Sequence, residues 1–334
     1  MKFLKKMLQV LLAVFFFSLL ATSTVLADDA DSEGWQFVQE NGRTYYKKGE
    51  IKETAWRVID GKTYYFDHVS GEMVVGWQYI PFPSKGSTIG PYPNGLRLEY
   101  MPMPKWYYFG QDGVLQEFVG KQVLEAKTAT NTNKHHGEQY DSPAEKRVYY
   151  FGDQRSYHTL KTGWISDEGH WYYLQEDGSF DARIDSLTVG ELVRGWTNDN
   201  STWYYLDPET GIMQTGWKQL GNKWYYLRSS GAMATGWYQE GSTWYYLDEP
   251  NGDMKTGWQY LGNKWYYLRS SGSMATGWYQ EGSTWYYLHA SNGDMKTGWF
   301  QVNGKWYYAY SSGALAVNTT VEGYSVNYNG EWVQ

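Results

Sequence analysis

The sequence predicts an all-β protein that is built as a solenoid of tandem β-hairpins. Gly-Trp pairs return every 20 or 21 residues from Trp196 to Trp299, and a second tryptophan follows each of them seven residues later. A two-residue turn sequence such as Gly221-Asn222 lies between the two tryptophans, and it is a strong hairpin signal. Short units that recur in tandem are typical of solenoids, in which each unit buries its apolar face against its neighbours.

The turn at Gly221-Asn222 fixes which residues face each other in one hairpin. The numbers of paired residues sum to 443, so Trp217 lies opposite Tyr226. Because side chains alternate between the two faces of a strand, Trp217 and Trp224 share one face and Tyr225 points to the other. Each hairpin therefore offers two indoles, and a phenol from a neighbouring hairpin can complete a three-ring box.

Residues 1–27 have the pattern of a secretory signal peptide. Three lysines precede an apolar run over 7–20, and Val25-Leu26-Ala27 is a small-residue cleavage site. Cleavage removes three lysines and no acidic residue, which changes the net charge from −7 to −10. The signal peptide predicts a secreted protein. The acidic charge disfavours a nucleic-acid partner, and the lack of a second long apolar run predicts no membrane span.

The first half of the mature chain, 28–195, carries degenerate repeats. Trp35, Trp56 and Trp77 keep a spacing of 21 residues, and the turn sequences Asn41-Gly42 and Asp60-Gly61 lie between them. The strands that follow these turns lack the second tryptophan. We therefore expect hairpins here without the two-indole face.

Between Trp77 and Trp164 the period breaks, and we expect long insertions at about 80–105 and 116–146. Six of the nine prolines lie in 81–104, which predicts a stiffened loop. The polar insertion at 116–146 is expected to be a loop with a short helical turn. Second strands remain recognisable at 106–110 and 148–152. Residues 196–334 then form regular repeats, which end in an atypical cap from Ala316 onward.

The pattern GWxxxxGxWYYLxxxGxMxTGW resembles the choline-binding repeat of surface proteins from the pneumococcus and its relatives. The chain is similar to the small members of this family that consist of repeats alone. The resemblance implies a left-handed β-hairpin solenoid that binds the phosphocholine of teichoic and lipoteichoic acids. It also implies attachment to the cell wall without a covalent bond, choline as the ligand, and no cofactor.

In the family, each site takes two tryptophans of one repeat and the first tyrosine of the next WYY. The resemblance carries this pattern onto five boxes: Trp196, Trp203 and Tyr225; Trp217, Trp224 and Tyr245; Trp237, Trp244 and Tyr266; Trp258, Trp265 and Tyr286; Trp278, Trp285 and Tyr307. A further combination has a longer spacing to the next Gly-Trp: Trp164, Trp171 and Tyr204.

The last repeat and the methionines of the repeat lead to two further expectations. No WYY follows Trp299 and Trp306, so we expect no complete box there. The methionines of the repeat either floor the sites or pack between hairpins: Met213, Met233, Met254, Met274 and Met295.

These residue types suit a quaternary ammonium ligand. Such a cation has no N–H to donate, so it is best bound by aromatic faces, each of which contributes about 0.5–2 kcal/mol. Three rings, less the cost of association, give a dissociation constant of roughly 1 mM. Several such sites on one repeating polymer gain effective concentration and bind firmly.

We expect a non-enzymatic protein that modulates choline-dependent wall hydrolases. One alternative is an adhesin that presents the loops of 78–162 to a host protein. A second is a wall hydrolase with a site in 78–162, where Glu138, Asp141 and Glu145 would be candidate carboxylates. His135-His136 is not expected to bind metal, because adjacent residues in an extended chain face apart. The copies in 28–77 also resemble glucan-binding repeats.

Overall fold

The computed structural model describes residues 24–25, 34–81, 104–138, 145–176 and 187–334. These residues divide into two compact units, 1–193 and 194–334. The predicted signal peptide lies outside the described residues except for Thr24 and Val25. Within the described parts of the chain, no helix is long and apolar enough to cross a membrane.

The described part of the first unit is formed by short antiparallel strands and includes the 3₁₀ turn η2 (Gln154–Ser156). Its strands are β1 (Thr24–Val25), β2 (Gln36–Glu40), β3 (Arg43–Lys48), β4 (Ile51–Lys52), β5 (Ala55–Ile59), β6 (Lys62–Phe66), β7 (Val74–Ile80), β8 (Lys105–Phe109), β9 (Gly120–Glu125), β10 (Lys134–His135), β11 (Lys146–Phe151), β12 (Gly163–Asp167) and β13 (His170–Leu174).

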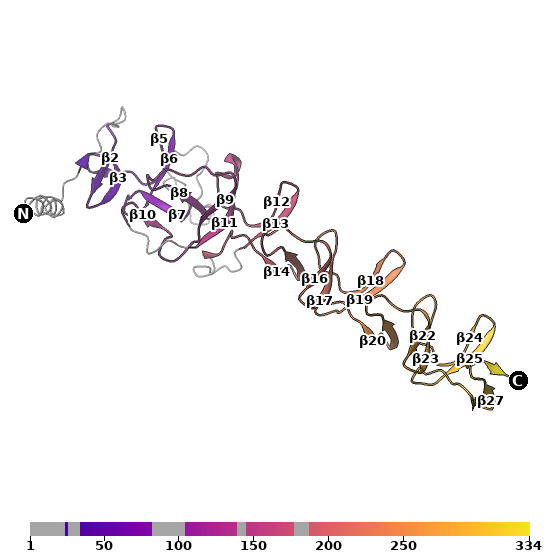
Figure 1. Ribbon diagram of the computed structural model, residues 1–334. Helices are drawn as coiled ribbons and strands as arrows, with labels where there is room; N and C mark the ends of the chain where they lie inside the picture. Colours follow the sequence, from indigo (N-terminus) through magenta and orange to yellow (C-terminus); the bar gives the residue numbers. More distant parts are fainter. Residues whose placement is uncertain (1–23, 26–33, 82–103, 139–144, 177–186) are drawn as a thin grey trace, which may run out of the picture. The chain divides into compact units, whose positions relative to one another are not determined.

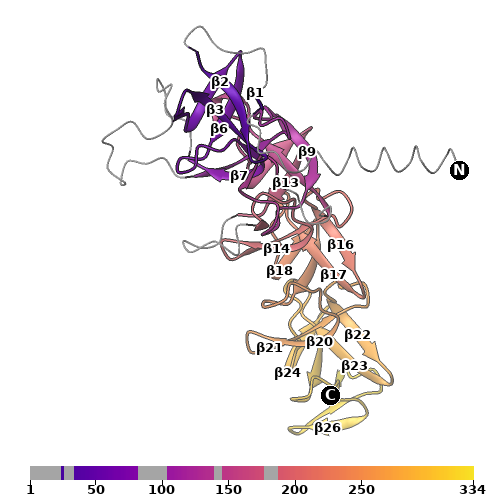
Figure 2. The same ribbon diagram turned by 90° about the vertical axis from the view of Figure 1, so that its left-hand side faces the viewer.

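The second unit consists of six hairpins and a terminal three-stranded sheet. Its strands are β14 (Gly195–Asp199), β15 (Thr202–Leu206), β16 (Gly216–Leu220), β17 (Lys223–Leu227), β18 (Gly236–Glu240), β19 (Thr243–Leu247), β20 (Gly257–Leu261), β21 (Lys264–Leu268), β22 (Gly277–Glu281), β23 (Thr284–Leu288), β24 (Gly298–Val302), β25 (Lys305–Ala309), β26 (Thr319–Val321), β27 (Tyr324–Val326) and β28 (Trp332–Val333). Figures 1 and 2 show these hairpins following one another in chain order. The all-β fold of tandem hairpins is confirmed.

The predicted register of the regular hairpin is confirmed. Trp217 pairs with Tyr226, and Leu220 pairs with Lys223 across the turn. Gly221 has a φ of +63°, a conformation that glycine adopts without the steric penalty of other residues. A positive φ at the first turn residue gives the twist that matches the two flanking strands.

Successive hairpins are joined by the segment that follows each WYYL strand. Leu227 is fully buried, and Met233 forms an isolated bridge to it. The backbone N–H of Met233 donates to the carbonyl of Trp203 in the preceding hairpin, over 2.8 Å. The same bond recurs at the next three methionines, so it links the hairpins at each step: Met254 to Trp224, Met274 to Trp244 and Met295 to Trp265.

The methionine side chains pack between the connecting segments of successive hairpins. A Cβ placed on Gly231 would lie only 2.3 Å from the sulfur of Met213. The contact repeats through the unit, from Met233 to Gly252, Met254 to Gly272, Met274 to Gly293 and Met295 to Gly313. The structure thus supports packing between hairpins, one of the two alternatives open from the sequence.

In the first unit, the predicted turns at Asn41-Gly42 and Asp60-Gly61 close the β2–β3 and β5–β6 hairpins. Strands β7 and β8 form a hairpin across the first insertion, with Trp77 paired to Tyr108 as Trp217 is to Tyr226. Most of that insertion, 82–103, lies outside the described residues.

The second insertion differs from the expectation of a loop with a helical turn. Strand β9 lies within it and pairs with β11 along its whole length. Gly120 pairs with Phe151 as Gly216 pairs with Leu227, so Gly120-Lys121 stands where a regular repeat has Gly-Trp. The prediction was wrong because the apolar residues of this strand are few, and the missing tryptophan hid its place in the repeat.

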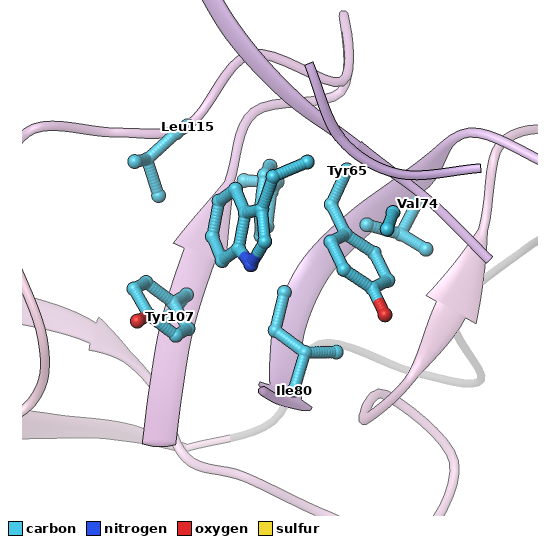
Figure 3. Packing of buried hydrophobic residues seen from close by; sticks show 8 residues of the cluster. Tyr65, Val74, Ile80, Tyr107 and Leu115 are labelled. Atoms are coloured by element: carbon cyan, nitrogen blue, oxygen red, sulfur yellow. The ribbon is translucent and has the colours of Figure 1, made fainter. Parts of the chain in front are cut away.

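The buried core of the first unit is aromatic. Trp56 packs with Tyr65, Ile80, Tyr107 and other residues in one cluster (Figure 3). A second cluster contains Trp77, Trp106 and Tyr149.

Candidate functional site

Five aromatic boxes recur along the second unit. In each, the first tryptophan of one hairpin lies 4.8 to 5.0 Å, centroid to centroid, from the first tyrosine of the next WYY, at a steep angle. In four of them the two tryptophans of the hairpin are 6.3 to 6.5 Å apart and almost perpendicular. The structure therefore brings together all three residues in four of the five boxes carried over from the family pattern, and in the fifth it brings Trp217 to Tyr245.

The boxes are open to solvent on one side. The second tryptophan is exposed to 40–44 % in four of the five, at Trp203, Trp224, Trp265 and Trp285. An exposed indole leaves apolar surface in contact with water, and a ligand that covers this surface gains free energy. By contrast, Tyr226 packs face to face on Tyr238 at 3.9 Å and so fills the space between two hairpins.

Alternate boxes carry a carboxylate, which the sequence reading missed. The ring N–H of Trp217 donates to Glu240 over 3.2 Å, and that of Trp258 donates to Glu281 over 3.1 Å. At the equivalent position, the boxes of Trp196 and Trp237 face hairpins that carry Leu220 and Leu261. The available signal was the 41-residue period, in which every second hairpin ends its first strand with glutamate. A carboxylate at the edge of a box favours a cationic ligand.

The expectation of no complete box at the end of the array was wrong. Trp299, Trp306, Tyr324 and Trp332 line a hollow of about 310 Å³. The ring of Tyr324 lies 5.7 Å from that of Trp299, nearly perpendicular to it. This box forms without a following WYY motif. The terminal sheet folds back and supplies the missing rings, Tyr324 from β27 and Trp332 from β28.

The terminal box keeps the carboxylate as well. The ring N–H of Trp299 donates to Glu322 over 3.0 Å. Lys305 forms an ion pair of 2.6 Å with Glu331, beside the backbone bridge between Tyr307 and Glu331 that joins β25 to the terminal sheet. A sequence signal was present, since Glu322-Gly323 repeats the Glu-Gly turn of the preceding hairpins.

Comparison with known families identifies these repeats. The choline-binding repeat matches residues 214–256 and 255–300, and the cell wall binding repeat matches 104–115, 162–180, 195–213 and 297–315. A solved structure of CbpJ from Streptococcus pneumoniae is 73 % identical and has a TM-score of 0.82, with coverage of 90 % of this chain and 100 % of that one. The chain belongs to the choline-binding protein family.

Choline binding protein F from the same organism is a second relative. Its structure with a peptidoglycan analogue is 61 % identical, with a TM-score of 0.81, and the match covers 91 % of this chain and 100 % of that one. Its complex with ipratropium is 58 % identical over the same shares of both chains, with a TM-score of 0.76. A search of curated proteins gives no match.

One combination expected from the choline-binding family pattern has residues in both units. Trp164 and Trp171 lie on the β12–β13 hairpin of the first unit, and Tyr204 lies on β15 of the second. That combination stays a prediction.

The candidate carboxylates of a hydrolase do not form a buried pair. Glu138 lies 3.5 Å from Lys134, and Glu145 lies 2.7 Å from Arg147, which lowers the pKa of Glu145. Asp141 lies outside the described residues. Among the described residues of 78–162, no carboxylate is buried.

The adjacent residues His135 and His136 contact different partners. His136 forms a hydrogen bond of 2.8 Å with Thr44, and His135 lies 3.2 Å from the buried carboxylate of Glu72. In the part of the chain that the structure describes, no three His, Cys, Asp or Glu side chains gather as metal ligands would.

Proposed function

We propose that the second unit attaches the protein to the cell wall by binding phosphocholine in six aromatic boxes. The observation that carries this proposal is the recurrence of the same ring geometry at every hairpin step, with tyrosine 4.8 to 5.0 Å from the first tryptophan in five of the boxes. The terminal box of Trp299, Trp306, Tyr324 and Trp332 is the sixth.

Ring faces on three sides suit a trimethylammonium group. Each face attracts the cation by about 0.5–2 kcal/mol, and the methyl groups displace water from exposed indole. The complex of choline binding protein F with ipratropium supports the same class of ligand, because ipratropium carries a quaternary nitrogen. One box then binds in the millimolar range, and several boxes on one teichoic acid bind together far more strongly.

Elution from walls tests the attachment. Millimolar choline is expected to release the protein from choline-containing cells, because free ligand competes at each weak site. A matched concentration of ethanolamine is the control, since a primary amine fits ring faces less well. Retention at saturating choline would place the anchor elsewhere.

We further propose that the attached protein is not an enzyme and modulates choline-dependent wall hydrolases. Occupied phosphocholine is unavailable to other choline-binding proteins, and the lack of a buried carboxylate among the described residues of 78–162 weighs against hydrolysis by the chain itself. The full chain is expected to slow lysis of choline-containing walls in a hydrolase assay. A variant with Trp217, Trp258 and Trp299 replaced by alanine keeps three of the six boxes and is expected to have a weaker effect, whereas an undiminished effect would point to the first unit.

A further inference from the structure

Trp77, Trp106 and Tyr149 repeat the box geometry inside the first unit. The ring of Trp77 lies 4.8 Å from that of Tyr149, and 6.3 Å from that of Trp106 at 85°. Regular boxes show the same two separations, as in 4.9 and 6.3 Å around Trp237. The strand positions also correspond, because Trp77 and Trp106 lie on one hairpin, β7–β8, and Tyr149 lies on β11 of the next.

This box already contains a cation from the chain. The ammonium nitrogen of Lys127 lies 4.7 Å from the ring centroid of Trp77, 5.4 Å from Trp106 and 4.4 Å from Tyr149. All three distances are within the range of cation–π attraction. The same nitrogen donates to the carbonyl of Val189 over 2.7 Å, and Lys127 is only 4 % exposed.

The segment that carries Lys127 is fastened to the box. The ring N–H of Trp77 donates to the carbonyl of Glu125 over 2.9 Å, and the backbone N–H of Lys127 donates to the hydroxyl of Tyr149 over 3.3 Å. Buried Asn131 donates to the carbonyl of Ala126 over 2.7 Å. The lysine is thus held in place from both sides of its own position.

Burying a lysine in apolar space is unfavourable in free energy, because its charged form loses contact with water. Burial lowers the pKa of Lys127 to about 7, and only the nearby Glu191, the ring faces and the Val189 carbonyl favour the charged form. The neighbouring box of the first unit is filled by an apolar side chain, without burial of a charge. There Thr63 stands in place of the second tryptophan, and the apolar side chain of Ile80 packs with Trp56 and Tyr107 (Figure 3). An ammonium fills the box that keeps both tryptophans.

We propose that Lys127 is a built-in ligand, whose ammonium occupies the box of Trp77, Trp106 and Tyr149 in place of choline. The contact closes this box to wall phosphocholine and binds the segment 125–131 to the scaffold. This inference rests on the proposed function of the regular boxes. Choline could enter this box only if the Val189 bond of the ammonium and the backbone bonds that fasten the Lys127 segment were broken together, so we expect the lysine to stay in place.

Two variants of the full chain test the proposal. Lys127→Ala empties the box, and Lys127→Met fills it with an apolar chain of similar length. Calorimetric titration with choline is expected to give one more site for Lys127→Ala than for the wild type, and no extra site for Lys127→Met. A folded Lys127→Ala chain, verified by near-ultraviolet circular dichroism, with an unchanged number of sites would overturn the proposal.

A measurement on the unliganded wild type separates this proposal from the function of the regular boxes. The Hε protons of Lys127 are expected to be shifted strongly upfield in the NMR spectrum by the three ring currents, with the signal assigned by its loss in Lys127→Met. Ordinary lysine shifts would refute the built-in ligand even if Lys127→Ala failed to fold. Absence of any choline site in the wild type, with the upfield signal present, would count against the proposed function alone.

Discussion

Replacing Gly252 with alanine tests how the hairpins are held to one another. Gly252 has a φ of +74°, and an added Cβ would lie 2.4 Å from the sulfur of Met233. The backbone conformation costs an alanine roughly 1–2 kcal/mol, and the forced shift of a packed side chain adds typically 1–3 kcal/mol. We therefore expect the free energy of unfolding of the second unit to fall by about 2–5 kcal/mol. Urea unfolding followed by tryptophan fluorescence measures this change.

Gly257 provides the matched control. Its φ is +76°, and nothing lies within 4 Å of an added Cβ, so Gly257→Ala carries the backbone strain alone. The difference between the two variants, about 1–3 kcal/mol, isolates the contact with Met233. The box of Trp237, Trp244 and Tyr266 spans the same step between hairpins, so Gly252→Ala should also weaken choline binding there. Equal destabilisation by the two variants would refute the packing role of the methionines.

Three further outcomes are expected. Trp244→Ala and Tyr266→Leu each remove the same choline site, so the double variant also loses one site in calorimetric titration. A loss of two sites in the double variant would mean that the register of the boxes is wrong. Glu281→Gln weakens one box by about 0.2–1 kcal/mol at low ionic strength, and the deficit shrinks in high salt; an effect independent of salt would argue against electrostatics. The pKa of Lys127 is about 7 in the folded chain and 10.5 ordinarily. The unfolded chain therefore binds more protons between these values, and stability rises with pH across that window. Lys127→Met, in which Glu191 remains, should lack this rise.

The regular half of the fold could be predicted from the sequence because local signals agree there. The glycine of the Gly221-Asn222 turn fixes the register, and alternation then places Trp217 and Trp224 on one face. The third ring, such as Tyr245, followed from the family pattern, since the contact between hairpins depends on how they stack.

The remaining features depend on contacts between distant residues. Tyr324 and Trp332 complete a box without the repeat motif, because the terminal sheet folds back onto Trp299. Lys127 enters a box whose members are separated from it by long stretches of chain. Nothing in the polar sequence of 116–146 marks that lysine as buried, although the valine and leucine of β9 gave a weak strand signal.

A crystal structure of the full chain soaked in choline tests the central claim most directly. The account predicts a trimethylammonium group in each of the six boxes of the second unit, including that of Trp299, Trp306, Tyr324 and Trp332. It also predicts that the box of Trp77 still contains Lys127. Boxes that remain empty at saturating choline, with their tryptophans still exposed, would contradict the account.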